Sequence, residues 1–299
     1  MKGNFLMKKL SIIEEAKKGK RLLNIFLVLI LGMIIIFGGS AIGYALVNLM
    51  PTSLTSDNFW NMIFSHTFGF FPVAILVFFV VKIVEGRSLT SIGFRKNKFF
   101  IKFILGFLLG FLSFTIVTVV LLITGTIAKN PDTSLLRGVP AIGSVIIAIF
   151  AWIVQSGTEE IFSRGWMLTS IGAKYNNVLA IIVTSLFFSV LHFTSGEVTI
   201  IAAINIALAG ILLAIYVIKS NDLWGAIGWH SAWNWAQGSV YGFQVSGNDL
   251  KLPSIFQLHS VGNKTITGGN FGPEAGIVAT FILVTIIIIL LSKKSWFED

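Results

Sequence analysis

Long apolar runs are the feature that most constrains this chain. A helix that crosses a bilayer needs roughly 20 mostly apolar residues, because the hydrocarbon layer is about 30 Å thick and each residue rises about 1.5 Å. The runs are continuously apolar, unlike the alternating strands of a membrane β-barrel. A mean hydropathy of +0.87 agrees with a membrane setting. The sequence therefore predicts an all-α fold, a polytopic membrane helical bundle of about eight transmembrane helices.

Short polar loops separate the predicted spans. These are Leu22–Met50, Phe59–Val84, Phe99–Ala128, Ile142–Met167, Val178–Phe193, Thr199–Ile218, Leu223–Tyr241 and Ala275–Leu291. The first run is longer than the apolar core of a cleaved signal peptide, about 7–15 residues, so we expect it to remain as a helix. Gly106 and Gly110 form a small-xxx-small pair that would allow close helix packing, with an exposed face of chance glycines as an equal alternative.

The formal net charge of +9 would suggest a nucleic-acid partner in a soluble protein. Here the cations gather in loops beside apolar runs, where they set topology, so we expect no nucleic acid and take the lipid bilayer as partner. We predict a basic cytoplasmic N-terminal segment (1–21), one transmembrane domain (22–292) with its catalytic core at about 142–241, and a cytoplasmic tail (293–299). The protein is then a multi-pass protein of the cell membrane.

This orientation gives a consistent alternation of loop charges. The inner cations would be Arg87, Arg95, Lys96, Lys98, Arg164, Lys174, Lys219, Lys293 and Lys294. The chain has no cysteine, which rules out disulfides, thiolate metal ligands and a cysteine nucleophile.

Charged side chains occur at the end of the fourth predicted span. Glu159, Glu160 and Arg164 follow the polar step Gln155–Thr158. Ionised groups are costly to remove from water, so such residues are functional candidates. Glu160 and Arg164 are four residues apart and can pair on one helix face, which leaves Glu159 to face a cavity or a water molecule.

Two further polar clusters lie in apolar helices. Phe188 and His192 stand one turn apart in the fifth span, and His230 and Asn234 share a helix face in the seventh. An isolated histidine would more often be a packed, hydrogen-bonded residue. The combination of all three clusters in a chain with only 12% charged residues makes chance burial the weaker explanation.

The order of these motifs resembles the CPBP family, the CAAX proteases and bacteriocin-processing enzymes, also called the Abi family. The matching residues are Glu159, Glu160 and Arg164, then Phe188 and His192, then His230 and Asn234. The basic loop Leu89–Lys96 is also similar to the segment often found ahead of that core. The resemblance implies an intramembrane CAAX-type endopeptidase that hydrolyses a peptide bond in a membrane-associated peptide or protein.

Peptide hydrolysis needs an activated water and donors that stabilise the oxyanion. The resemblance implies that Glu159 is the general base, that His192 helps to hold the water, and that His230 and Asn234 donate to the oxyanion. No cofactor is expected in this mechanism. The supporting residues are Glu160, Arg164 and Phe188.

A zinc-dependent metalloprotease is the alternative, with Glu159, His192 and His230 as ligands and water in the open position. Against it, the sequence lacks the compact His-Glu-xx-His arrangement, and Asn234 is an unusual zinc ligand.

Serine catalysis by Ser163, Ser189 or Ser231 is less favoured. No Gly-x-Ser-x-Gly elbow is present, and serines in membrane helices commonly bond to their own backbone carbonyls.

Two classes without peptidase activity are also considered. A transporter would commonly carry internal repeats, and none is found. A catalytically silent scaffold, an immunity or regulatory protein, would keep the fold and the motifs. When Glu159 is replaced by alanine, a scaffold should keep its cellular effect and a protease should lose it.

One feature conflicts with convergence of these residues. His192 lies about 14 residues, or roughly 21 Å, into its predicted span, nearer the outside than Glu159. Either that helix is tilted or the segment Gly165–Asn177 dips into the membrane. The outer segment Gly242–Pro273 is expected to be a loop, with a lid as the alternative.

Overall fold

The computed structural model describes residues 10–132, 134–194 and 198–292. The start of the predicted basic segment and the whole predicted tail lie outside these residues. The principal helices are α1 (Ile12–Ala16), α2 (Ile25–Asn48), α3 (Thr52–Thr55), α4 (Asn58–Phe68), α5 (Phe71–Phe79), α6 (Phe99–Ile123), α7 (Ile142–Glu160), α8 (Leu168–Lys174), α9 (Asn177–Leu191), α10 (Ile200–Ser220), α11 (Trp224–Trp235), α12 (Lys264–Thr267) and α13 (Ile277–Ser292).

Short helical turns of other types complete several of these helices. Wider π-helical turns are η1 (Val80–Val84), η4 (Ile161–Met167) and η6 (Ala236–Tyr241). Tighter 3-10 turns are η2 (Leu89–Ile92), η3 (Val139–Ala141), η5 (His192–Thr194), η7 (Gly269–Phe271) and η8 (Pro273–Ala275). The strands β1 (Ile127–Lys129) and β2 (Leu258–Ser260) pair antiparallel.

The predicted helical membrane bundle is confirmed. Within the described residues, six helices are long and apolar enough to cross a membrane. The other two predicted spans are also helical. α11 with η6 is more polar and lies buried within the bundle, and α13 is a shorter apolar helix.

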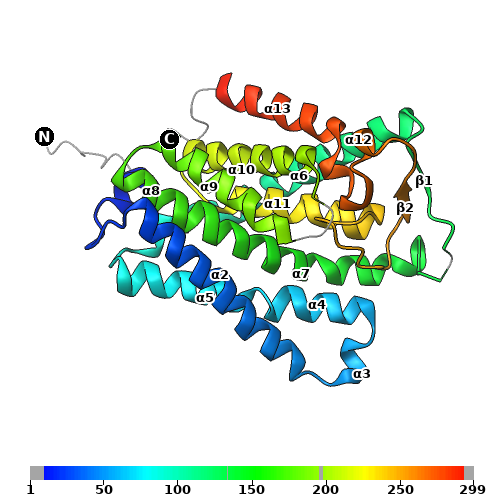
Figure 1. Cartoon of the computed structure of the whole chain (residues 1–299), viewed down its shortest axis with the longest axis horizontal. Coiled ribbons are helices and arrows are strands. Elements are labelled where there is room, and N and C mark those ends of the chain that lie inside the picture. The colour runs from blue at the N-terminus through cyan, green and yellow to red at the C-terminus, as the bar shows by residue number, and fades with distance from the viewer. Residues whose placement is uncertain (1–9, 133, 195–197, 293–299) are drawn as a thin grey trace, which may run out of the picture.

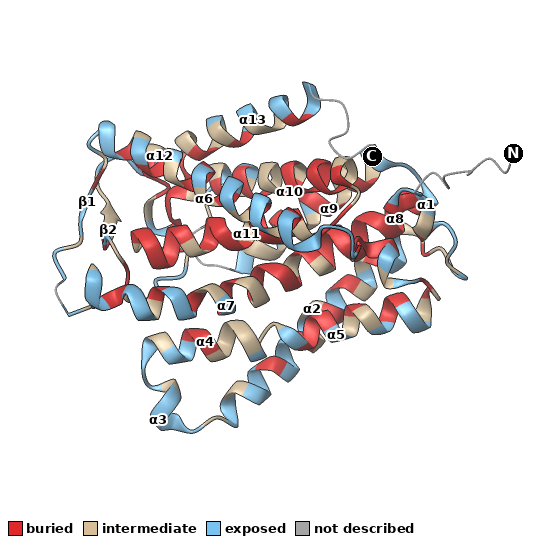
Figure 2. Cartoon of the chain, turned by 180° about the vertical axis from the view of Figure 1, so that it is seen from behind, coloured by how far each residue is buried: buried red, intermediate tan, exposed pale blue. Residues whose placement is uncertain are grey.

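The helices form two groups (Figure 1). The larger group holds α6 to α11, with α13 along one side, and α2, α4 and α5 form a separate layer beneath α7. Buried residues concentrate on α8, α10 and α11, whereas α2 and α13 are exposed along much of their length (Figure 2). The second predicted span, Phe59–Val84, consists of α4, α5 and η1, with a short turn around Gly69 between α4 and α5.

The fourth predicted span is longer than expected. Helical structure continues without a break from Val139 to Lys174, through α7, η4 and α8. The predicted end at Met167 is therefore wrong, and Arg164 is a fully buried helical residue rather than a loop cation. Polar residues of α8 are compatible with burial because they bind a neighbouring segment: Arg87 donates to the hydroxyls of Thr169 and Ser170 at 2.9 Å.

Glycines of α6 allow α11 to approach backbone to backbone. A Cβ atom on Gly106 would collide with the carbonyl oxygen of Gly225, and one on Gly110 would collide with that of Trp229. The predicted close packing at this glycine pair is confirmed. Because His230 follows Trp229 directly, this contact also fixes the height of His230 in the bundle.

The segment predicted as an outer loop has defined structure. β2 pairs with β1, which corrects the prediction that the third helix extends to Ala128, since α6 ends at Ile123. α12 and η7 follow, and η8 leads into α13. This segment lies at the end of the bundle opposite α1 (Figure 1).

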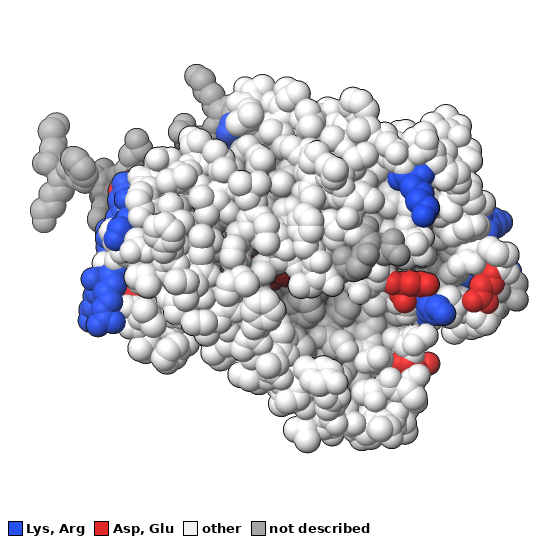
Figure 3. Space-filling model, viewed as in Figure 1, with Lys and Arg blue, Asp and Glu red and all other residues white. Residues whose placement is uncertain are grey.

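Basic residues gather at the end of the molecule where α1 lies (Figure 3). Exposed cations there are Lys18, Lys20, Arg21, Lys96, Lys98 and Lys174. The first and last described helices both end here: Ile12 N donates to Asn221 Oδ1 at 2.6 Å, and Lys219 lies against Leu291 O at 3.5 Å. The beginning and the end of the described chain therefore lie at the same end of the bundle, and the cytoplasmic placement of the termini stays a prediction.

Candidate active site

The paired charges of the first motif lie at the centre of the larger helix group. Glu160 and Arg164 form the predicted i, i+4 ion pair, with Arg164 Nη1 2.8 Å from Glu160 Oε1, and both side chains are buried. The guanidinium carbon lies 4.3 Å above the centre of the Phe188 ring, a cation–π contact. This pair starts at the junction of α7 and the π-helical turn η4, a type of irregularity frequent at functional sites.

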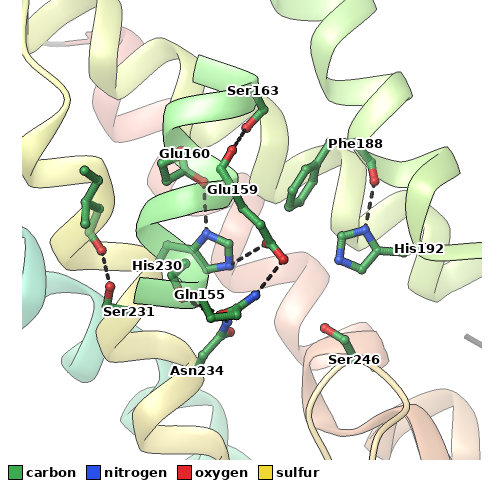
Figure 4. Close-up of polar contacts among 12 residues, drawn as sticks. Gln155, Glu159, Glu160, Ser163, Phe188, His192, His230, Ser231, Asn234 and Ser246 are labelled. Atoms are coloured by element: carbon green, nitrogen blue, oxygen red, sulfur yellow. Dashed lines mark hydrogen bonds and ion pairs between the residues drawn. The ribbon is translucent and has the colours of Figure 1, made fainter. Parts of the chain in front are cut away.

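Glu160 also fixes the ring of His230. His230 Nδ1 lies 2.9 Å from Glu160 Oε1, and Nε2 on the other side of the ring lies 3.8 Å from Glu159 Oε2. An ionised carboxylate can only accept, so Nδ1 donates to Glu160. The ring therefore stands between two carboxylates of α7 (Figure 4).

Glu159 faces a cavity, as predicted, but its carboxylate also lies beside the same His230 ring that Glu160 binds. Gln155 Nε2 donates to Glu159 Oε1 at 2.6 Å, which leaves Oε2 toward His230. Gln155 was not predicted as a functional residue, although it belongs to the polar step ahead of the motif. Its position four residues before Glu159 is the sequence signal for this contact.

His192 is held by a backbone carbonyl. Its Nδ1 lies 2.8 Å from Phe188 O, and because a carbonyl only accepts, Nδ1 carries the hydrogen. In the neutral ring Nε2 is then an acceptor. The ring packs edge-on against Phe188, whose own ring lies 6.3 Å from that of His230. Phe188 thus separates the two imidazoles and contacts both.

Asn234 binds within the protein. Its amide nitrogen donates to Gln155 Oε1 at 3.1 Å and to Ser156 Oγ at 3.2 Å. Gln155 therefore joins Glu159 of the first motif to Asn234 of the third. In this arrangement both amide hydrogens of Asn234 have partners, so donation to a substrate requires an exchange of partner.

Four of the motif residues, Glu159, Phe188, His192 and Asn234, line a cavity between the two helix groups, which we call the main cavity. Its volume is about 490 Å³. Gln155, Glu159, His192 and Asn234 line it together. The helices α2, α4, α5 and α7 contribute further side chains, which are Ile36, Ser40, Ser65, His66, Val73 and Trp152. Figure 3 shows a hollow on this face of the molecule. The outer segment contributes Val245, Ser246, Asn248 and Leu250 to the lining, so it covers part of the cavity.

A smaller cavity of about 50 Å³ lies on the other side of His192, which we call the annex. It shares Phe188, His192, Asn234 and Ser246 with the main cavity, and Glu274 and His230 also line it. The sequence did not point to Glu274, because it is an isolated acid in a segment expected to be a loop.

Glu274 lies in η8, is partly buried, and lines the annex. Burial raises the pKa of its carboxyl group, and a hydrogen bond from the backbone N–H of Ser246, at 2.5 Å, opposes that rise. Asn205 holds the same segment by donating to the carbonyls of Glu274 and Gly276 at 2.8 and 2.9 Å.

The three candidate serines bind backbone carbonyls. Ser189 Oγ donates to Ala203 O at 2.8 Å and Ser231 Oγ to Ile227 O at 2.7 Å, while Ser163 Oγ donates to the carbonyl of Glu159. None of the three donates to a histidine. The arrangement offers no activated serine nucleophile.

The same residues include the side chains that could bind a metal ion. Glu159, His192 and His230 are suitable ligand types, and both rings have Nδ1 engaged, which would leave Nε2 for coordination. Among the described residues, however, no three His, Asp or Glu side chains lie close enough together to hold one ion. In this arrangement the three side chains do not surround one common point.

The length of the fourth helix explains how Glu159 and His192 can lie at the same depth in the bundle. Glu159 lies 15 residues before the end of α8 at Lys174, and His192 lies 15 residues after the start of α9 at Asn177. Each is therefore about 22 Å from the connection between the helices. Neither a tilted helix nor a dipping segment is needed, because the segment after Gly165 is helical.

Comparison with known proteins supports the motif assignment. Residues 141–236 match the family model described as type II CAAX prenyl endopeptidase, Rce1-like. This confirms the resemblance to the CPBP family over the segment that carries all the motif residues.

One curated relative is the uncharacterized protein YyaK of Bacillus subtilis (strain 168), 26% identical over 156 residues, which are 48% of this chain and 45% of the relative. The chain therefore spans less than half the length of that relative. No solved structure matches the chain.

Proposed function

Because its core matches a CAAX-type endopeptidase model, we propose that this chain is an intramembrane endopeptidase that hydrolyses a peptide bond in a membrane-associated peptide or protein. The observation that carries the proposal is the convergence of Glu159, His192 and Asn234, from three helices, on the main cavity. Its volume of about 490 Å³ is in the range of small-molecule sites, about 300–1,000 Å³, and accommodates a short stretch of extended peptide.

In the proposed mechanism Glu159 is the general base. It takes a proton from a water held with the help of His192, and the water oxygen attacks the scissile carbonyl carbon. The proton passes to the amide nitrogen as the C–N bond breaks, which gives a carboxylic acid and an amine. Gln155 orients Glu159 through its 2.6 Å hydrogen bond.

His230 and Asn234 are the proposed oxyanion donors. His230 donates from Nε2 when the ring carries both protons, a form that the flanking carboxylates of Glu159 and Glu160 can both bind. Asn234 would exchange its bonds with Gln155 and Ser156 for one with the substrate. Glu160, Arg164 and Phe188 support these groups by fixing the rotation of η4 and the ring of His230.

A zinc-dependent mechanism with the same residues remains the alternative proposal. The engaged Nδ1 atoms of His192 and His230 favour it, and the spacing of the donor set opposes it. Activity of purified protein in chelator separates the two, since strict metal dependence would overturn the metal-free mechanism.

A scaffold without activity is tested by the Glu159→Ala variant. New amino termini of membrane proteins are measured by mass spectrometry in cells with the parent chain, with Glu159→Ala, and with the exposed-site control Glu14→Ala. We expect products that depend on the parent and on the control and that disappear with Glu159→Ala. Identical sets of amino termini in all three strains would reject the peptidase.

A further inference from the structure

The annex differs from the main cavity in size. Its volume is about 50 Å³, whereas one water needs about 10–15 Å³, so it has room for a few water molecules and not for a peptide side chain of ordinary size. Six polar residues line it. These are His192, Asn205, His230, Asn234, Ser246 and Glu274.

Two hydrogen-bond acceptors face this small space. His192 donates from Nδ1 to Phe188 O, so in the neutral ring Nε2 accepts. An ionised carboxylate can accept about four hydrogen bonds, and Glu274 accepts from the N–H of Ser246 and lies close to the Gln237 amide. Lone pairs therefore remain on both groups, and water is the donor that a cavity of this size admits.

The surrounding charges do not provide another partner for Glu274. The titratable groups that line the annex are Glu274, His192 and His230, and Glu159 and Glu160 stand beyond His230. No lysine or arginine lines the annex among the described residues. Asn205 and Ser246 bind the η8 segment and so hold the carboxylate in place.

We propose that the annex is a water site that supplies the hydrolytic reaction, and that Glu274 is its positioning residue. A water that donates one hydrogen to Glu274 and one to His192 Nε2 is held in the annex, and it exchanges the bond to Glu274 for one to Glu159 when it moves into the main cavity and Glu159 takes its proton. His192 lines both cavities, so water held here lies next to the cavity that Glu159 lines. The inference rests on the proposed peptidase function and adds a source of water within an apolar bundle.

The test compares the charge and the shape of residue 274. Glu274→Gln keeps the acceptor for Ser246 but replaces the free acceptor by an NH₂ donor, whereas Glu274→Asp keeps the carboxylate. The readout is the rate at which Glu159-dependent amino termini appear on membrane proteins of the host cells. We expect Glu274→Gln to lower the rate about 10- to 100-fold, because a small displacement of the attacking water has an effect of this size. Glu274→Asp keeps the carboxylate and should retain most of the parental rate.

Three further variants complete the design. Asp249→Asn, an exposed acid in the same outer segment, is the control and should match the parent. Ala209→Leu places a larger apolar side chain at the annex wall without changing a charge, and should slow the reaction as Glu274→Gln does. If the Glu274→Gln protein does not accumulate in cells, the cleavage rates of Glu274→Asn and Glu274→Asp are compared instead. These two variants also differ only in having an amide or a carboxylate, on a shorter side chain.

The outcomes distinguish this inference from the proposed function. If Glu159→Ala abolishes cleavage but Glu274→Gln is as active as Glu274→Asp, or Ala209→Leu is as active as the parent, the water site is wrong and the peptidase stands. If Glu159→Ala leaves the amino termini unchanged, the peptidase assignment itself fails.

Discussion

Two groups of buried charges in this molecule differ in how completely they are satisfied. At the basic end, Arg87 donates to Glu85, Thr169 and Ser170, and Ser170 also donates to Glu85, so the buried pair is enclosed by hydrogen bonds. In the candidate site, Glu160 Oε2 and both Nε and Nη2 of Arg164 have no hydrogen-bond partner among the described residues.

Missing hydrogen bonds do not by themselves separate structural charges from functional ones, because Glu15 Oε2 and Arg95 Nε at the basic end also lack a partner. Buried polar groups are normally hydrogen-bonded, and exceptions in a native structure call for an explanation. Lys102 and Asp222, a second buried pair, join α6 to the start of α11 and lie outside both cavities. Burial of charge alone therefore does not mark the active site. Carboxylates and imidazoles with spare bonding capacity beside a cavity do.

The largest effect is expected from Glu159→Gln. The variant keeps the shape of the side chain and removes the base, so peptidase activity should fall about 10²- to 10⁴-fold. Thermal unfolding in detergent should stay close to that of the parent, because Glu159 faces the main cavity. If the folded Glu159→Gln variant kept the parental activity, the charges of the candidate site would be no more functional than the buried pair at the basic end.

Arg87→Met should affect stability instead. It leaves Glu85 buried without its cation, which costs about 3–5 kcal/mol of unfolding free energy. Activity per folded molecule should be unchanged, because the pair lies at the basic end. Unfolding by denaturing detergent measures the first quantity, and a selective loss of activity without a loss of stability would contradict the structural assignment.

His230→Ala tests the proposed oxyanion donor. Removal of one such donor typically lowers the rate about 10²- to 10³-fold. The cleavage rate of the folded variant is the measurement. Retention of more than about a tenth of the parental rate would exclude His230 from this role.

Gln155→Leu should have a smaller effect. It removes the donor to Glu159 Oε1 while Glu159 and the cavity remain, so we expect about a ten-fold loss, equivalent to one hydrogen bond to a charged group. The measurement is the cleavage rate of Gln155→Leu, compared with that of Glu159→Gln in the same assay. A loss as large as that of Glu159→Gln would make Gln155 part of the chemistry itself.

Lys17→Ala should have the smallest effect. Its ion pair with Glu14 is half exposed on both sides, so its removal should change the unfolding free energy by less than about 1 kcal/mol. Denaturing-detergent titration beside Arg87→Met gives the contrast directly. Equal losses in the two variants would mean that burial does not distinguish these pairs.

Much of the fold follows from local sequence. The apolar runs predict every long helix, and the spacing of Glu160 and Arg164 predicts their pairing. The continuation through Thr169 and Ser170 to Lys174 could not be predicted, because those polar residues are accommodated by Arg87, about 80 residues away in the chain. Strand β1 likewise depends on a partner in the outer segment.

The candidate site divides in the same way. The motif residues stand out as polar groups in apolar runs, so sequence alone identifies them. Glu274 does not stand out, because its neighbours are loop residues and its place beside His192 depends on how the outer segment folds over the bundle. Contacts between distant segments are the part of a site that local patterns do not predict.

The central claim is that Glu159 faces water inside the membrane bundle. Because the chain has no cysteine, Glu159→Cys introduces a single thiol, and Phe150→Cys places one on an exposed apolar position of the same helix. Both proteins in liposomes are treated with a water-soluble, charged thiosulfonate reagent. We predict that the thiol at position 159 is modified and that the one at position 150 is not. If position 159 is as unreactive as position 150, the water-filled cavity does not exist and the proposed chemistry has no place to occur.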